Sequence, residues 1–338
     1  MKRRWDVDEL TSQVLAGSRA HLARALTLVE SSRQDHRELA RDLLSRLRPH
    51  TGDAVRVGIS GVPGAGKSTF INALGMRLIA QGHRVAVLAV DPSSSKSGGS
   101  ILGDRTRMVD LAVSDDAFIR PSPSGGHLGG VARATREAML VVEAAGFDVI
   151  LVETVGVGQS EVAVAGMVDT FLLIALSGSG DQLQGIKRGI LELADVITVN
   201  KADGDNASKA RMAARDLAVA MRLMHSDPHQ RRTAVLTCSA YTGDGLDDVW
   251  KAVVDHRASL EESGDLAERR ADQQRQWLWA LVESELATAL KNSASVKKIR
   301  DRVEDGVAEG EISALEGAAE ILGALVEDLP SYGWDTES

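Results

Sequence analysis

Cysteine, aromatic residues and long apolar runs are all scarce in this sequence of 338 residues. The single cysteine, Cys238, excludes an internal disulfide and favours a reducing compartment. With aromatic residues at 3%, the core has to be built from Ala, Val, Leu and Ile. No apolar stretch reaches the roughly 18 residues that a membrane span needs, and the basic start of the chain lacks a signal peptide's apolar segment. We therefore expect a cytoplasmic protein with no membrane partner.

An excess of positive charge is also missing. The formal net charge is −9 at pH 7, which argues against nucleic acid or an anionic membrane as a general partner. Hydrophobic residues make up 43% of the chain and charged residues 26%, as in ordinary globular proteins, which argues against disorder. A single bound anion is still compatible with this charge, because a phosphate site needs only local donors.

The hydrophobic pattern divides the chain into three parts. Residues 1–50 repeat Leu and Val at three- and four-residue spacing, which predicts an N-terminal helical arm. Residues 51–255 alternate β-rich runs with helical segments, which predicts an α/β domain whose mainly parallel sheet is flanked by helices. Residues 256–338 are helical again and predict a C-terminal extension. The predicted strands are 55–60, 84–90, 147–153, 170–176, 195–200 and 233–239, and the clearest helices between them are 67–80, 131–145 and 206–224.

A P-loop motif, GVPGAGKS, occupies residues 61–68, directly after a predicted strand and directly before a predicted helix. Its glycines let backbone N–H groups turn inward, and the start of the helix adds a partial positive charge. The ammonium group of Lys67 would bind the β and γ phosphate oxygens, and the hydroxyl of Ser68 would ligate Mg²⁺. The predicted phosphate-binding residues are Gly61, Gly64, Ala65, Gly66, Lys67, Ser68 and Thr69.

A second motif, NKAD at residues 200–203, indicates the base. The carboxylate of Asp203 can accept hydrogen bonds from both N1–H and the exocyclic N2–H of guanine, an arrangement that adenine does not offer. The stem of Lys201 can lie along the base while Asn200 braces the loop. Ser239 and Ala240 end the next predicted strand, where GTPases place backbone donors against the guanine oxygen. GTP and GDP are therefore the predicted ligands.

Acidic residues at the predicted strand ends indicate a magnesium site. Glu153 opens the sequence ETVG and stands where the DxxG switch of GTPases has Asp. Asp91 ends another strand, and Asp104 lies in the adjoining loop. These three carboxylates and Ser68 can supply direct or water-mediated contacts to Mg²⁺, while the N–H of Gly156 is placed to bond the γ-phosphate. The predicted catalytic residues are Lys67, Asp91, Asp104 and Glu153.

One catalytic group is absent from its expected position. In a Ras-like arrangement, a Gln after the switch Gly orients the attacking water, but this chain has Val157 there. A valine side chain cannot form that hydrogen bond. We therefore expect slow intrinsic GTP hydrolysis, with a partner or a loop rearrangement supplying what is missing.

Together these residues resemble the MeaB/ArgK/MMAA family of GTPases over nearly the whole chain. The resemblance rests on GVPGAGKST at 61–69, DPSSS at 91–95, GDRTRM at 103–108, HLGGVARAT at 127–135, ETVGVGQSE at 153–161, NKAD at 200–203 and SAYTGDG at 239–245. It implies a G-protein chaperone that gates adenosylcobalamin delivery to methylmalonyl-CoA mutase and protects or reactivates that enzyme. It also implies a homodimer formed through the C-terminal extension and a partner-responsive loop at 177–188. The nucleotide and Mg²⁺ residues that it implies are Lys67, Asp91, Asp104 and Glu153.

Two other functions remain as alternatives. A metal-delivery GTPase of the hydrogenase or urease maturation type would need clusters of Cys or His at ligand spacing. This chain has one Cys and eight scattered His, which speaks against that function. A small-molecule P-loop kinase would need a basic lid and no guanine motif, so the NKAD sequence at 200–203 speaks against it.

Overall fold

The computed structural model describes residues 5–31, 33–90, 108–122, 128–154, 160–177, 188–224 and 233–328. At its centre lies a seven-stranded sheet in the order β3-β2-β4-β1-β5-β6-β7, and neighbouring strands pair in parallel throughout. The sheet confirms the predicted fold class. Its strands are β1 (Val55–Gly61), β2 (Val85–Val90), β3 (Ala117–Ser122), β4 (Val149–Thr154), β5 (Thr170–Leu176), β6 (Val196–Asn200) and β7 (Ala234–Thr237).

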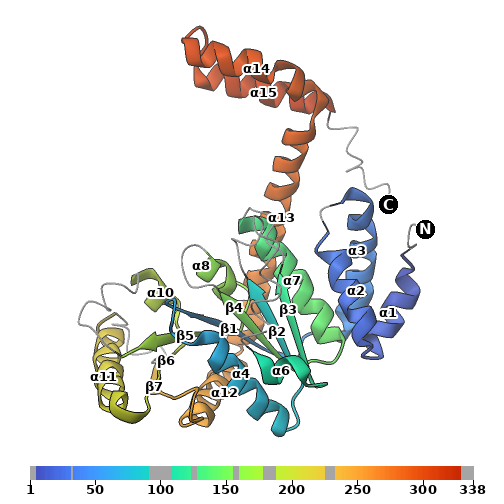
Figure 1. The fold of residues 1–338 in the computed structure, drawn as a ribbon. Helices are drawn as coiled ribbons and strands as arrows, with labels where there is room; N and C mark the ends of the chain where they lie inside the picture. The colour runs from blue at the N-terminus through green and yellow to red at the C-terminus, as the bar shows by residue number, and fades with distance from the viewer. Residues whose placement is uncertain are drawn as a thin grey trace. The chain divides into compact units, whose positions relative to one another are not determined.

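Helices cover both faces of the sheet (Figure 1). Side chains alternate along a strand, so β5 directs Leu172 and Ile174 to one face and Phe171 and Leu173 to the other. On the first face lie α4 (Lys67–Ala80), α6 (Val109–Val113) and α12 (Leu246–Ser263). On the second face lie α7 (Leu128–Ala144), α8 (Ser160–Ala165), α10 (Arg188–Leu193) and α11 (Ala207–Met224). A short 3₁₀ turn, η3 (Gly204–Asn206), precedes α11.

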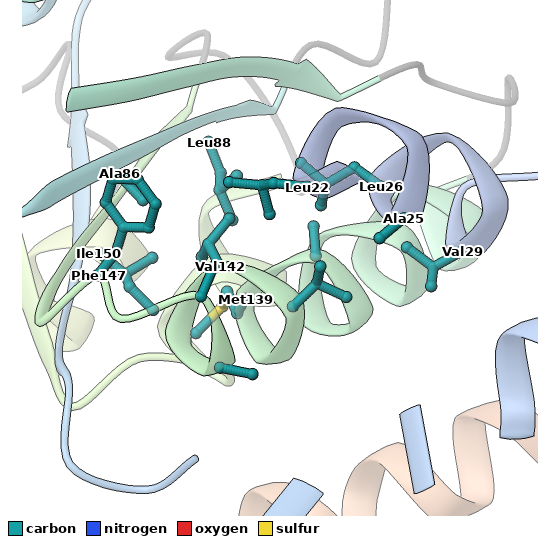
Figure 2. Close-up of a cluster of buried hydrophobic side chains, with 14 of the residues drawn as sticks. Leu22, Ala25, Leu26, Val29, Ala86, Leu88, Met139, Val142, Phe147 and Ile150 are labelled. Carbon is teal, nitrogen blue, oxygen red and sulfur yellow. The ribbon is translucent and has the colours of Figure 1, made fainter. Parts of the chain in front are cut away.

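Three N-terminal helices share a core with the second face of the sheet. They are α1 (Val7–Leu15), α2 (Arg19–Val29) and α3 (Gln34–Leu47), followed by the 3₁₀ turn η1 (Arg48–His50). Figure 2 shows Leu22 and Leu26 of α2 in one cluster with Met139 and Val142 of α7 and Leu88 of β2. Burying these side chains together attaches the N-terminal helices to α7 and the sheet.

The sequence analysis does not predict β3. This strand is short and contains Pro121, whose missing N–H excludes it from the middle of a sheet. The structure places β3 at the edge, paired with β2 on one side, where a proline is tolerated. The sequence pattern lacked the alternation or continuous apolar run by which strands are recognised.

The C-terminal helices are α13 (Asp265–Asn292), α14 (Ala294–Glu309) and α15 (Ala314–Asp328). Residues up to 273 belong to one compact unit and residues from 274 onward to a second. In the second unit Ala289, Val296 and Leu325 form a small core. Several large apolar side chains of this unit are exposed, namely Leu278, Trp279, Val282, Leu286, Leu315, Leu322 and Val326. None of the described helices is long and apolar enough to span a membrane.

Candidate nucleotide site

The P-loop connects the end of β1 to the first turn of α4. Gly66 precedes the helix with a φ of 85°, in the left-handed region. A Cβ at this position would lie 2.8 Å from Nδ2 of Asn200, so only glycine fits both the backbone conformation and the close approach. Gly61 is similarly confined, because a Cβ there would lie 2.2 Å from the carbonyl oxygen of Ile174. The sequence therefore dictates this loop shape through its glycines.

Lys67 begins α4, and its side chain folds back over the loop. Its Nζ donates to the carbonyl oxygen of Gly61 at 2.9 Å and lies 3.5 Å from that of Val62. Lys67 is only 9% exposed, so its ammonium group is held at the P-loop instead of extending into solvent. Thr69, in the same first turn, is exposed.

Ser68 and Glu153 meet at the carboxyl end of the sheet. The hydroxyl of Ser68 donates to Oε1 of Glu153 at 2.9 Å. The contact forms because β4 pairs with β1, with Glu153 opposite Ile59, and α4 begins just beyond the end of β1. A hydroxyl oxygen beside a carboxylate oxygen is a donor set that suits Mg²⁺, so these two residues fit the predicted metal. Asp91, Asp104 and Gly156 lie outside the described residues.

Asn200, at the end of β6, braces the P-loop against a second loop. Its Nδ2 donates to the carbonyl oxygen of Ala65 at 2.9 Å, and its Oδ1 accepts from the backbone N–H of Ala240 at 3.0 Å. The residue is almost fully buried, so its amide is satisfied by protein groups on both sides. In this structure the N–H of Ala240 is directed at Asn200, and Ala240 takes part in the site through that bond.

Lys201 has a φ of 61° and is the one residue other than glycine with a positive φ in the described part of the chain. Left-handed backbone in a lysine stores strain, and such strain is concentrated at functional sites. Two hydrogen bonds hold the conformation in place. Nδ2 of Asn206 donates to the carbonyl oxygen of Lys201 at 2.6 Å, and the N–H of Ala202 donates to the carbonyl oxygen of Cys238 at 3.0 Å.

Asp203 is oriented by the neighbouring loop. The hydroxyl of Ser239 donates to Oδ1 of Asp203 at 2.7 Å and accepts from the N–H of Thr242 at 3.1 Å. The adjacent Cys238 is buried, and burial raises the pKa of its thiol to about 11, although a hydrogen bond from Thr198 opposes the rise. Its thiol lies 3.6 Å from Oδ1 of Asn200 and so belongs to the brace described above.

The structure thus brings three groups of predicted residues together at one end of the sheet: Ala65 and Gly66 with Asn200 and Ala240, Ser68 with Glu153, and Asp203 with Ser239. The sequence analysis missed Asn206, which supports the strained backbone of Lys201. An Asn shortly after a turn often bonds to a nearby backbone carbonyl, but the pattern does not say which one.

A P-loop between a strand and a helix, on a parallel sheet with a base-recognition motif at the same edge, defines the class of P-loop nucleotide-binding proteins. Residues 22–295 match the family described as methylmalonyl Co-A mutase-associated GTPase MeaB. The chain belongs to this family of GTPases. The match confirms the family resemblance drawn from the sequence motifs.

Relatives with known descriptions agree with this assignment. The chain is 57% identical over 316 residues to a probable GTPase of Mycobacterium tuberculosis, covering 94% of each chain. It is 44% identical to the mouse mitochondrial methylmalonic aciduria type A homolog, covering 94% of this chain and 79% of the mouse protein. Among solved structures it is similar to one described as an LAO/AO transport system kinase, with a TM-score of 0.73, 38% identity and coverage of 94% and 96%.

Proposed function

We propose that this protein is a Mg²⁺-dependent GTPase that slowly hydrolyses GTP to GDP and phosphate and serves as a chaperone of methylmalonyl-CoA mutase. In this role it gates the loading of adenosylcobalamin and protects or reactivates the mutase. The observation that carries the proposal is the convergence of the P-loop, Glu153 and the Asn200–Asp203 loop at one end of the sheet of a member of this family.

The phosphates would bind in the P-loop. Backbone N–H groups between Gly64 and Thr69 would face them, together with the positive end of α4. The ammonium group of Lys67 donates to the carbonyl oxygen of Gly61. A phosphate oxygen can replace this neutral acceptor and form a stronger, charge-assisted hydrogen bond. Lys67 would therefore neutralise charge on the β and γ phosphates.

Ser68 and Glu153 would hold Mg²⁺, with Asp91 and Asp104 as the further carboxylates. The described pair supports this role because its two oxygens already lie 2.9 Å apart. When bound, the metal would neutralise charge on the phosphate oxygens. Glu153 and the two aspartates would orient the metal and its waters, and Gly156 would bond the γ-phosphate through its N–H.

Guanine would be selected by Asp203. Its Oδ1 is fixed by Ser239, and the strained backbone of Lys201 presents the loop to the base. Asn200 would transmit the position of this loop to the P-loop, because it bonds to Ala65 directly. Binding of the base would therefore be coupled to the position of the P-loop.

Slow turnover follows from Val157, which cannot orient a water molecule as Gln does in Ras-like proteins. Binding of the mutase would then accelerate hydrolysis by completing the site. The mutase is proposed as the partner because the matching family is described as mutase-associated and because relatives include methylmalonic aciduria type A homologs. We place the protein in the cytoplasm, without nucleic acid or membrane partners.

The C-terminal extension, 256–338, is proposed to form a homodimer. Its support is the row of exposed apolar side chains on α13 and α15, including Trp279, which is 64% exposed. Light scattering at micromolar protein should return twice the chain mass of 36.0 kDa. Trp279→Asp should yield a monomer, whereas Leu223→Asp, at an exposed position on α11, should leave the dimer intact. A monomeric wild type would contradict the dimer.

The direct test is the GTP hydrolysis rate of the purified protein with Mg²⁺, measured alone and with methylmalonyl-CoA mutase from the same organism. We expect a slow basal rate that the mutase raises severalfold, and no such stimulation with Lys67→Ala. A rate that the mutase does not change would contradict the partner. Transfer of phosphate to a small molecule without hydrolysis would contradict the GTPase itself and favour a kinase, as the description of the solved relative suggests for that protein.

A further inference from the structure

Two buried hydroxyl groups meet beside the nucleotide site and have no role in the account above. Oγ1 of Thr154 donates to Oγ of Ser60 at 2.9 Å, and the two side chains are 0% and 1% exposed. Ser60 directly precedes Gly61 of the P-loop, and Thr154 directly follows Glu153. β1 and β4 pair in parallel with Ile59 opposite Glu153, so Ser60 and Thr154 form the next step at the ends of these strands.

The hydroxyl pair lies on the opposite face of the sheet from Glu153. Val152, two residues before Thr154, packs in the core on the α7 and α8 face. A Cβ on Gly58, two residues before Ser60, would meet Val164 of α8 at 2.8 Å. Because side chains alternate, Glu153 points to the α4 face, where Ser68 donates to it. The end of β4 is therefore held by a hydrogen bond on each face of the sheet, from Thr154 to Ser60 on one and from Ser68 to Glu153 on the other.

Burying two hydroxyl groups costs free energy unless they find hydrogen-bond partners, and here Thr154 donates to Ser60. Valine would fill the Thr154 position with the same shape and a high strand propensity. The hydroxyl pair is thus not needed to build the strand. Its position next to both Glu153 and the P-loop indicates what it does instead.

We propose that Thr154 is a positioning residue for Mg²⁺ binding. Its bond to Ser60 fixes the end of β4 against the end of β1, so that the carboxylate of Glu153 stays in place at Ser68 as nucleotide and metal bind and leave. This inference rests on the proposed function, since it assigns a role in the Mg²⁺-nucleotide site. It concerns the position of a metal-binding carboxylate and adds no reacting group.

The test is the Mg²⁺ dependence of nucleotide binding and hydrolysis in Thr154→Val, which keeps the shape and removes the hydroxyl donor. We expect the half-saturating Mg²⁺ concentration for binding of fluorescent GDP to rise about 5-fold, the size expected for one hydrogen bond. The kcat for GTP should fall by a similar factor at limiting Mg²⁺, while the KM for GTP at saturating Mg²⁺ stays within twofold. Thr154→Ser retains a hydroxyl and should restore the wild-type Mg²⁺ requirement.

A matched control separates positioning from stability. Thr170→Val removes another fully buried threonine hydroxyl, which is 2.8 Å from Nδ1 of His256 at the other end of the sheet. It should lower the Tm about as much as Thr154→Val does, without changing the Mg²⁺ requirement. Equal Mg²⁺ requirements in wild type, Thr154→Val and Thr170→Val would overturn the proposal.

The outcomes also distinguish this inference from the proposed function. If the wild type binds Mg²⁺ and GDP but does not hydrolyse GTP, the proposed function fails, and the binding measurement still decides the role of Thr154. A wild type that binds no Mg²⁺-nucleotide would overturn both. In a double-mutant cycle, Ser60→Ala combined with Thr154→Val should raise the Mg²⁺ requirement no further than Thr154→Val alone, and additive effects would contradict a direct bond.

Discussion

Among the described residues, the interactions at the two ends of the central sheet differ. At the amino ends of the strands, charged side chains are paired with one another. Arg270 donates to both carboxylate oxygens of Asp169 at 2.8 Å, and Arg269 lies 3.2 Å from Asp195. At the carboxyl ends, Lys67 bonds to a backbone carbonyl and Glu153 to the hydroxyl of Ser68.

The difference supports the proposal that ligands bind at the carboxyl ends. Removing one partner of a buried ion pair is costly, because the other charge stays buried without compensation. At the carboxyl ends, Lys67 donates to the carbonyl oxygen of Gly61, and a phosphate oxygen can replace that bond with a charge-assisted one. The ion pairs of Arg269 and Arg270 with Asp195 and Asp169, here called the clamp, attach the first turns of α13 to the sheet, and the carboxyl ends are the proposed ligand end.

The clamp also includes α12 and α7. Nε2 of His256 lies 3.2 Å from Oδ1 of Asp195, while Arg56 donates to Glu143 at 2.7 Å. Glu143 in turn accepts from the backbone N–H groups of Gly52 and Ala54. Residues from six segments of the chain therefore meet in ion pairs and hydrogen bonds at this end, and the first turns of α13 are fixed to the sheet.

The largest expected effect on stability comes from removing Arg270, which pairs with Asp169 in the clamp. Arg270→Met would leave Asp169, whose side chain is fully buried, without its charged partner. Such a change should lower the free energy of unfolding by about 3–5 kcal/mol, measured by urea denaturation. Arg33→Met, which breaks an ion pair between two exposed side chains, is the control and should leave the denaturation midpoint unchanged. Equal midpoints for both variants would show that the clamp does not stabilise the fold.

The next largest effect is the removal of Lys67 at the ligand end. Lys67→Ala should weaken GTP binding by about 100- to 1000-fold, because a preorganised donor to phosphate is lost. Its Tm should remain close to that of the wild type, in contrast to Arg270→Met. Lys209→Ala, at an exposed position on α11, provides the control. A large loss of Tm in Lys67→Ala would erase the distinction between the two ends.

The smallest effect concerns acid stability. Burial alone raises the pKa of Asp195, but the hydrogen bond to His256 and the charge of Arg269 outweigh burial, and the net pKa lies below the usual 3.8. A carboxyl whose pKa is lowered in the folded state stabilises the protein above its unfolded pKa, and this contribution is lost as the pH falls through the folded pKa.

We therefore expect Asp195→Asn to cost about 1.5–3 kcal/mol at pH 7 and to reduce the dependence of stability on pH below about pH 4. Urea denaturation at pH 3 to 7 measures both quantities. An unchanged acid slope in Asp195→Asn would mean that other carboxyls account for the acid sensitivity.

The sequence contains local motifs that predict a ligand site, whereas no local motif predicts the clamp. The P-loop and the NKAD sequence are contiguous, because each wraps its ligand with neighbouring backbone and side-chain groups. The clamp joins Arg56, Glu143, Asp169, Asp195 and Arg270, which lie far apart in the sequence and form no local pattern. Ordinary charged residues of this kind are expected on the surface, and only the fold brings them together.

Prediction of the strands from the sequence has a similar limit. Strands with a continuous apolar run, such as β2 and β4, were predicted because they are buried on both faces. The edge strand β3 was missed because Pro121 and its polar surroundings resemble a loop. The bond between Thr154 and Ser60 depends on the register of β1 and β4, which no single segment specifies.

The most direct test of the central claim, that the carboxyl end of the sheet is a guanine nucleotide site, is competition for bound fluorescent GDP by GTP, ATP and xanthosine triphosphate. In the wild type GTP should displace the probe and ATP should not. Asp203→Asn should bind GTP about 10- to 100-fold more weakly and gain affinity for xanthosine triphosphate, while Asp205→Asn, two residues further on and exposed, should behave as wild type. Unchanged GTP binding in Asp203→Asn, or displacement by ATP as strong as by GTP, would contradict the account.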